Sequence, residues 1–149
     1  MACKSIYSIG SSTRGPREFV ELLKAYKIET LADVRRFPTS RFEHFVEENL
    51  ERILKGAGIE YIFLGDELGG MRRTGYEDYT TTEDFKEGVS KLEEIAEDKR
   101  TAFMCAERLP WKCHRRFIGF ALRERGWRVI HIIEEKRVWE PKDDSGPDV

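Results

Sequence analysis

The sequence predicts one α/β domain with a mostly parallel, five-stranded sheet and helices on both faces. Short apolar segments alternate with segments whose apolar residues recur at helical spacing, in the order β-α-β-α-β-α-β-α-β. The length of 149 residues suits a single hydrophobic core. We expect the domain to span residues 1–140 and residues 141–149 to form a disordered tail.

The N-terminal part supplies two strands and one helix. Residues 4–9 are predicted to be a strand, and a hydroxyl-rich loop leads from it to a helix that begins near Pro16. Residues 30–35 form the second strand. The loop of residues 36–45 follows, is rich in arginine and phenylalanine, and contains Pro38, which breaks regular structure.

The rest of the chain continues the alternation. Three further strands are predicted at residues 60–64, 101–105 and 127–133. Three further helices are predicted over residues 46–55, from Thr82 onward, and from Cys113 to Gly126. The loop of residues 65–82 is longer than α/β connections usually are, which favours a role as a binding loop or lid.

The composition excludes several classes of protein. Hydrophobic residues make up 40% of the chain, which is enough for a core and excludes long-range disorder. No apolar run approaches the roughly 18 residues of a membrane span, and the N-terminus lacks the apolar stretch of a signal peptide. We therefore expect a soluble, cytoplasmic protein with no membrane partner. The oligomeric state stays open.

The charge is unevenly distributed along the chain. The net charge of −2 is not typical of a nucleic-acid-binding domain. Residues 108–128, however, contain seven Lys and Arg against one Glu, whereas residues 83–98 contain seven acidic residues against two lysines. This pattern predicts either a basic and an acidic surface or two solvated helix faces.

Polar and charged residues follow four of the predicted strands. In parallel sheets, ligands bind beyond the carboxyl ends of the strands. The residues in question are Ser11, Ser12, Thr13 and Arg14; Asp33, Arg35 and Arg36; Asp66, Glu67, Gly69 and Gly70; and Cys105, Glu107, Cys113, His114 and Arg115. We expect these groups to converge on one site.

A thiol at the end of a buried strand has two interpretations. Cys105 lies near a predicted helix start and several arginines, which would lower its pKa and make it a nucleophile. Alternatively, Cys105 is a small buried apolar side chain. With Cys113 it could also form a redox pair, and Cys3 would then be the third, unpaired cysteine.

A metal site is the weaker interpretation of the same residues. Cys105, Cys113 and His114 would need His44 or His131 to complete a zinc site. Their spacing matches no common zinc motif. We therefore expect neither a metal nor a cofactor.

Three carboxylates are candidates for acid–base chemistry. Asp33, Glu67 and Glu107 are predicted to face one cavity, where one of them would position or deprotonate a water molecule. Ion pairs with the neighbouring arginines are an equally good explanation. Arg115, next to His114 at a helix start, would hold an anion or pair with Glu107.

Two loops combine cations with aromatic rings, as nucleic-acid-binding surfaces do. The residues concerned are Arg35, Arg36, Phe37 and Phe42 in the first loop, and Arg72, Arg73, Tyr76 and Tyr79 in the second. Such residues suit phosphate contacts and base stacking. Alternatively, Phe42 and Phe45 dock their loop onto the core.

The combination of motifs resembles the domain of unknown function 488 family. The motifs are Gly10-Ser11-Ser12-Thr13-Arg14, Asp33-Val34-Arg35, Pro38 with Ser40 and Phe45, Leu68-Gly69-Gly70, Cys105-Ala106-Glu107, Cys113-His114-Arg115 and His131-Ile132. The resemblance runs from about Ile6 to Ile133. It implies a link to DNA base modification and to glycosylase-type removal of modified pyrimidines. Family members often have a larger residue in place of Ser11.

A looser similarity connects the chain with rhodanese-like domains. Those domains carry sulfur or phosphoryl groups on a cysteine placed as Cys105 is here, after a strand, with an Asp-x-Arg strand elsewhere. This sequence departs from them because residues 106–112 contain no glycine to form a tight amide cradle. Glu107 would also raise the pKa of a neighbouring thiol.

These observations lead to an expected function with two alternatives. We expect an enzyme that acts on DNA or another nucleic acid and hydrolyses the bond to a modified base, with a carboxylate positioning water and aromatic rings stacking on the displaced base. The first alternative is a sulfur- or phosphoryl-transfer enzyme centred on Cys105. The second is a non-catalytic module that binds an anion or nucleotide.

Overall fold

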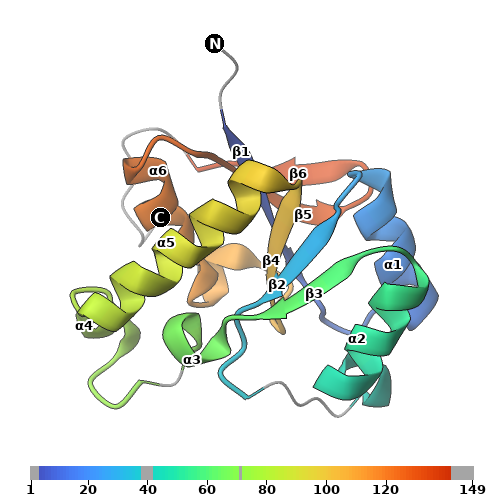
Figure 1. The fold of residues 1–149 in the computed structure, drawn as a ribbon, viewed down its shortest axis with the longest axis horizontal. Coiled ribbons are helices and arrows are strands. Elements are labelled where there is room, and N and C mark those ends of the chain that lie inside the picture. Colours follow the sequence, from blue (N-terminus) through green and yellow to red (C-terminus); the bar gives the residue numbers. More distant parts are fainter. Residues whose placement is uncertain (1–3, 38–41, 71, 142–149) are drawn as a thin grey trace.

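A six-stranded sheet organises the protein. The computed structural model describes residues 4–37, 42–70 and 72–141. The strand order is β3-β2-β4-β1-β5-β6 (Figure 1). The strands are β1 (Ser5–Gly10), β2 (Thr30–Asp33), β3 (Glu60–Phe63), β4 (Thr101–Cys105), β5 (Arg128–Glu134) and β6 (Arg137–Trp139). The first five are mutually parallel, as predicted, and β6 runs antiparallel to β5.

The sixth strand was not predicted. β6 has three residues, and only Trp139 among them is partly buried. The turn between β5 and β6 consists of Glu135 and Lys136, without the glycine or asparagine that usually marks a hairpin. A short, charged edge strand of this kind has no apolar pattern from which to predict it.

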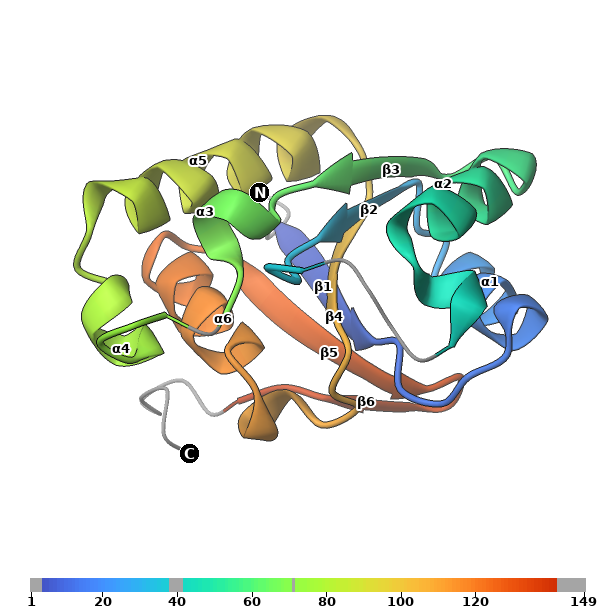
Figure 2. The same ribbon diagram turned by 90° about the horizontal axis from the view of Figure 1, so that it is seen from below.

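Helices cover both faces of the sheet, which confirms the predicted architecture (Figure 2). Helix α1 (Pro16–Ala25), the 3₁₀ turn η1 (Glu43–Phe45) and α2 (Glu47–Gly56) pack on one face. Helices α3 (Gly65–Leu68), α5 (Glu83–Asp98) and α6 (Arg115–Glu124) pack on the other. No helix in the described part of the chain is long and apolar enough to cross a membrane.

The alternation of side chains along β4 places its residues in two parts of the core and sets the direction of the Cys105 side chain. Successive side chains of a strand point to opposite faces. In β4, Ala102 and Met104 join the core under α1 and α2, whereas Phe103 and Cys105 join the core under α5 and α6. The thiol of Cys105 therefore points toward the start of α6.

The long connection between β3 and α5 is more ordered than we predicted. It contains α3 and a second short helix, α4 (Tyr76–Tyr79). The Tyr76 hydroxyl donates to the Leu68 carbonyl oxygen at 2.7 Å, and the Tyr79 hydroxyl donates to that of Glu67 at 2.7 Å. These bonds tie α4 to α3, so the described residues of this segment pack onto the domain.

Candidate active site

A cavity of about 490 Å³ opens at the carboxyl ends of β2 and β4. The chain leaves β2 toward the α2 face and leaves β4 toward the α6 face, so the two loops diverge and a crevice forms between them. The residues that line it are Arg35, Arg36, Phe37, Gly70, Cys105, Ala106, Glu107, Cys113 and His114. Eight of these, all except Ala106, were candidate site residues from the sequence.

Two cysteines meet in the wall of this cavity. Cys105 ends β4 with 2% of its surface exposed, and Cys113 lies between the 3₁₀ turn η2 (Pro110–Lys112) and α6. Their Sγ atoms are 2.9 Å apart, and both residues are free cysteines. The pair brings together two thiols that are eight residues apart in the chain.

The Arg115 side chain donates to both sulfurs. Its Nε lies 2.9 Å from Cys105 Sγ and 3.3 Å from Cys113 Sγ, and its backbone N–H also donates to Cys113 Sγ at 3.3 Å. Three donor–sulfur contacts from one residue stabilise a negative charge on the pair.

The two thiols differ in acidity. Burial alone would raise the pKa of Cys113, but the hydrogen bond from Cys105 and the charge of Arg115 outweigh burial and lower this pKa to about 5. Burial and the hydrogen bond to Cys113 raise the pKa of Cys105 well above its ordinary value. The two thiols titrate as a coupled pair. At neutral pH the pair holds one proton, and the negative charge lies mainly on Cys113.

Behind the sulfurs lies a buried polar network. Arg115 is fully buried, and its remaining donors go to Ser8 Oγ at 3.0 Å and to the Glu107 carbonyl oxygen. Ser8 Oγ also contacts His131 Nδ1, on the neighbouring strand β5. Arg115 is therefore enclosed and does not extend into the cavity, in contrast to the phosphate contact that we expected of it.

Ser8 was not predicted as part of the site, and His131 was considered only as a possible zinc ligand and as part of a family motif. They face each other in register on β1 and β5, and both are buried. The available signal was a polar residue at an inward position of each of two otherwise apolar strands. Two such residues in adjacent strands indicate a buried hydrogen-bonded network.

His114 lines the cavity beside the two cysteines, and its two ring nitrogens have different roles. Its Nε2 donates to the Val34 carbonyl oxygen at 2.8 Å, so Nδ1 carries the lone pair of the neutral ring. Burial lowers the pKa of His114, which favours this neutral form. Gly70 lies opposite: a Cβ there would be 3.1 Å from Nδ1, so a side chain at this position would crowd the imidazole ring.

A metal ion fits these residues poorly. The ligand atoms of Cys105, Cys113 and His114 lie within 4.8 Å of one another, and three ligands with an open position are what catalytic zinc sites use. However, the Arg115 guanidinium already contacts both sulfurs, and a divalent cation would lie against this buried positive charge. The histidines that might complete the set bond elsewhere: His131 to Ser8, and His44 to the Arg14 carbonyl oxygen.

The three candidate carboxylates do not converge. Asp33 is fully buried, and both its oxygens accept hydrogen bonds from Arg35, while Tyr61 donates to Oδ2 at 2.6 Å. Glu67 pairs with Lys91 on α5. Of the three, only Glu107 lines the cavity, where its side chain accepts from the Leu109 backbone N–H at 3.2 Å.

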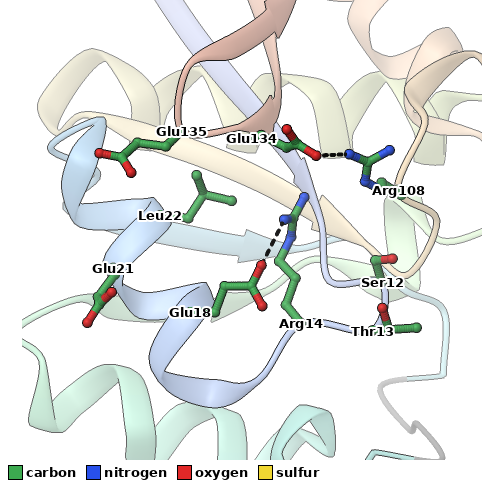
Figure 3. A pocket seen from close by; sticks show the side chains of 9 residues that line it. All are labelled: Ser12, Thr13, Arg14, Glu18, Glu21, Leu22, Arg108, Glu134 and Glu135. Atoms are coloured by element: carbon green, nitrogen blue, oxygen red, sulfur yellow. Dashed lines mark hydrogen bonds and ion pairs between the residues drawn. The ribbon is translucent and has the colours of Figure 1, made fainter.

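The residues after β1 line a second cavity of about 450 Å³ (Figure 3). Ser12, Thr13 and Arg14 lie there with Glu18 and Arg108, at the ends of β1 and β5. The Arg14 side chain is 6% exposed and donates to the carbonyl oxygens of Gly10 and Ile133, at 3.1 and 2.7 Å. These residues are therefore not part of the cysteine cavity.

The remaining candidates pack on the domain rather than in the cavity. Phe42 packs against the core under α1 and α2. Arg72 donates to the Gly69 carbonyl oxygen at 2.8 Å and stacks on Tyr79, while Tyr76 packs against the ring of His114. Arg73 is exposed. Pro38, Ser40 and residues 142–149 of the expected tail lie outside the described residues.

The basic and acidic segments partly neutralise each other. Arg125, just after α6, pairs with Glu93 of α5 at 2.7 Å. Arg128 pairs with Glu140, outside the acidic segment, at 2.7 Å. With Arg115 buried, the basic segment does not present all its charges on one surface.

Comparison with known proteins identifies the family. Residues 15–122 match the family described as Domain of unknown function DUF488. No curated protein and no solved structure gives a significant match. The matched range includes both cysteines of the pair, His114 and Arg115. Because this match covers well over half of the chain, and in agreement with the motifs read from the sequence, the protein belongs to the DUF488 family.

Proposed function

We propose that this protein is a cysteine-dependent enzyme in which the thiolate of the Cys105–Cys113 pair attacks a substrate bound in the cavity. The observation that carries the proposal is the Arg115 Nε, which donates to two sulfurs that lie 2.9 Å apart in the wall of a cavity. Thiolates stabilised by a neighbouring cation are the usual nucleophiles of cysteine enzymes.

Cys113 rather than Cys105 is the attacking sulfur. Cys105 is almost completely buried at the end of β4, whereas Cys113 is partly exposed. The same residue has the lowered pKa, which makes it the thiolate at neutral pH. Our expectation from the sequence centred on Cys105, and the proposal moves the nucleophile to its partner.

The cavity rim supports a small, partly apolar substrate. Phe37 is 58% exposed, and the Arg36 guanidinium lies 5.7 Å from its ring centre. Arg35 also lines the cavity, but its charge is matched by Asp33. Sulfur and phosphoryl groups are the electrophiles that we considered from the sequence for such a thiolate.

Alkylation as a function of pH tests this proposal. The rate of reaction of each cysteine with iodoacetamide is measured by peptide mapping. We expect Cys113 to react with an apparent pKa well below the free-thiol value of about 8.5. Cys3→Ser is the control, because it removes the one thiol outside the pair. An apparent pKa near the free value for Cys113 would overturn the proposal.

A second candidate keeps the function that we first expected, the hydrolysis of the bond to a modified base in nucleic acid. Two observations favour it: Glu107 lines the cavity, and Phe37 at its rim is exposed enough to stack on a base. Fluorescence anisotropy with labelled DNA across a salt series tests the partner, because phosphate contacts make log affinity fall linearly with log salt.

The same candidate makes a distinct prediction for activity. Oligonucleotides that carry modified pyrimidines should develop abasic sites, and Glu107→Gln should slow this reaction by about 10²–10⁴-fold. Cys113→Ser should leave it unchanged. Absence of DNA binding even at low salt would eliminate this candidate and leave the cysteine enzyme.

A further inference from the structure

Two thiols lie at the cavity, although nucleophilic attack by a cysteine requires only one. Cys113 is partly exposed, and Cys105 is buried behind it, with Sγ atoms 2.9 Å apart. An oxygen or sulfur group attached to Cys113 Sγ would therefore stay within reach of the Cys105 thiol. A second thiol has no part in phosphoryl transfer, but it is what closing a disulfide requires.

The surroundings of the pair favour its reduced form. Arg115 is fully buried, and the pair supplies its negative partner. If a disulfide closed, the guanidinium would keep only neutral acceptors, Ser8 Oγ and the Glu107 carbonyl oxygen. Stabilising the thiolate makes the corresponding disulfide a strong oxidant that thiols reduce easily. Disulfide substrates would therefore oxidise the pair poorly.

We propose that the substrate class is hydroperoxides, with Cys113 as the attacking cysteine and Cys105 as the resolving cysteine. Cleavage of the weak O–O bond drives the oxidation of a thiolate by a hydroperoxide, and the sulfenic acid that forms condenses with a second thiol, so a hydroperoxide can close even a disulfide that is easily reduced. The inference rests on the proposed function, since it requires the Cys113 thiolate as nucleophile.

The reaction balances in two steps. The Cys113 thiolate attacks the terminal oxygen of R–O–O–H, so that an S–O bond forms, the O–O bond breaks, and R–O⁻ leaves and takes a proton from water. The Cys105 sulfur then attacks Cys113 Sγ, so that the S–S bond forms and the S–O bond breaks. Hydroxide leaves with the Cys105 proton as water.

The electrons balance as well. The hydroperoxide gains the two electrons that the two cysteines lose. A dithiol reductant, which is itself oxidised to a disulfide, returns the pair to its thiol form. Arg115 stabilises the thiolate and so makes the disulfide easier to reduce, which favours this last step.

The experiment uses the reduced full-length chain with tert-butyl hydroperoxide and, in a parallel arm, hydrogen peroxide. We expect consumption of one equivalent of hydroperoxide and a Cys105–Cys113 disulfide in the peptide map. The rate should exceed that of free cysteine at neutral pH. Ionisation alone can contribute at most about thirtyfold, because a thiolate of lower pKa is also a weaker nucleophile. Faster reaction with the organic compound would indicate that the apolar rim binds its alkyl group.

Variants separate the roles of the two cysteines. In Cys105→Ser, the sulfenic acid should persist on Cys113 and react with dimedone; in Cys113→Ser, rapid oxidation should be lost. Cys3→Ser is the matched control, and glutathione disulfide is the control oxidant, which should leave most of the pair reduced. Circular dichroism checks that each variant folds.

Three outcomes would overturn the inference: no disulfide in the wild-type chain, first oxidation at Cys105, or a rate no greater than that of free cysteine. The disulfide and the rate measured on the wild-type chain test the inference even if a variant does not fold. A low apparent pKa of Cys113 in the alkylation experiment, without disulfide closure by hydroperoxide, would refute this inference and leave the proposed function standing. Failure of both experiments would refute both.

Discussion

Arg115 Nε lies 2.9 Å from Cys105 Sγ, and the same nitrogen lies 3.3 Å from Cys113 Sγ, so one buried cation serves both sulfurs. A fully buried guanidinium is strongly destabilising unless an anion meets it. The thiolate of the pair is the anion placed against it. The stability of buried Arg115 and the acidity of the pair are therefore two consequences of one interaction.

Replacing Arg115 should reduce the acidity of the pair. In Arg115→Gln, the pKa of the reactive thiol should rise toward the free value of about 8.5. Alkylation by iodoacetamide near pH 6.5 should then slow by up to about a hundredfold, because the thiolate fraction falls about tenfold for each unit by which the pKa exceeds the pH. Arg115→Lys keeps the charge but not the planar fork of donors, so we expect an intermediate rate.

Arg125→Gln is the matched control for this prediction. Arg125 lies just beyond the opposite end of α6 and pairs with Glu93, so its loss should not change the alkylation rate. An unchanged rate in a folded Arg115→Gln chain would show that another group ionises the pair.

The free energy of unfolding should increase with pH between about pH 5.5 and about pH 8.5. The pKa of Cys113 is about 5 in the folded protein, below the free-thiol value of about 8.5. In this window, the unfolded chain binds a proton that the folded chain has released, so stability rises by at most about 1.4 kcal/mol per pH unit. Cys105 has a raised pKa, so its contribution is lost as the pH rises further.

Urea denaturation of the wild type and of Cys113→Ser at several pH values measures this effect. The difference between the two chains should widen as the pH rises through the window. His131 also has a lowered pKa, chiefly because it is buried, but it is present in both chains and its contribution cancels. A difference that does not change with pH would mean that Cys113 is protonated in the folded protein.

Most of the fold could be predicted because its pattern is local. The apolar strand residues and the helical spacing of Phe19, Leu22 and Leu23 in α1 are readable in the sequence, and they pack as expected. The two short helices α3 and α4 were missed because each has four residues and depends on tertiary bonds such as that from Tyr76 to Leu68. A segment of this length has too little periodicity to predict.

The candidate site was predicted in part. The rule that ligands bind beyond strand ends correctly brought Arg36, Cys105 and His114 to one cavity. It could not show which side chains face that cavity and which turn inward. Asp33 and Arg35 lie two residues apart and satisfy each other, and Arg115 turns inward to the sulfurs, because these choices depend on packing.

Removing the charge of Asp33 should reduce stability. Asp33 and Arg35 are 0% and 5% exposed and are joined by contacts of 2.9 and 2.8 Å. Asp33→Asn leaves a buried guanidinium without its anion, which should lower the free energy of unfolding by about 3–5 kcal/mol. Glu97→Gln, which breaks an exposed pair with Lys4, should cost less than about 1 kcal/mol.

Denaturation with urea measures both variants, and the result decides between two roles for Asp33. If Asp33→Asn keeps its stability but loses activity on a substrate, Asp33 acts on that substrate, as we first expected. If it loses stability as stated, the carboxylate holds Arg35 in place at the cavity.

Adding a single methyl group to Gly10 should displace backbone atoms that contact the cysteine pair. Gly10 ends β1, and a Cβ there would lie 2.0 Å from the Glu107 carbonyl oxygen. That oxygen accepts a hydrogen bond from Arg115, which also donates to both sulfurs, so moving it changes the contacts of the pair. Gly10→Ala should therefore lower the free energy of unfolding by about 1–3 kcal/mol and raise the apparent pKa of Cys113.

Gly15→Ala is the control for this change, because a Cβ at Gly15 would meet nothing within 4 Å and its φ of −74° suits any residue. Because Gly15 is the N-cap of α1 and alanine is a poorer cap than glycine, this change should cost at most about 1 kcal/mol and should leave the alkylation profile unchanged. Urea denaturation and the alkylation profile measure both variants. If Gly10→Ala loses stability while the alkylation profile keeps its midpoint, the Glu107 carbonyl oxygen supports the fold but does not control the thiolate. A shift of both would connect the end of β1 to the chemistry of the pair, through a backbone contact that only glycine permits.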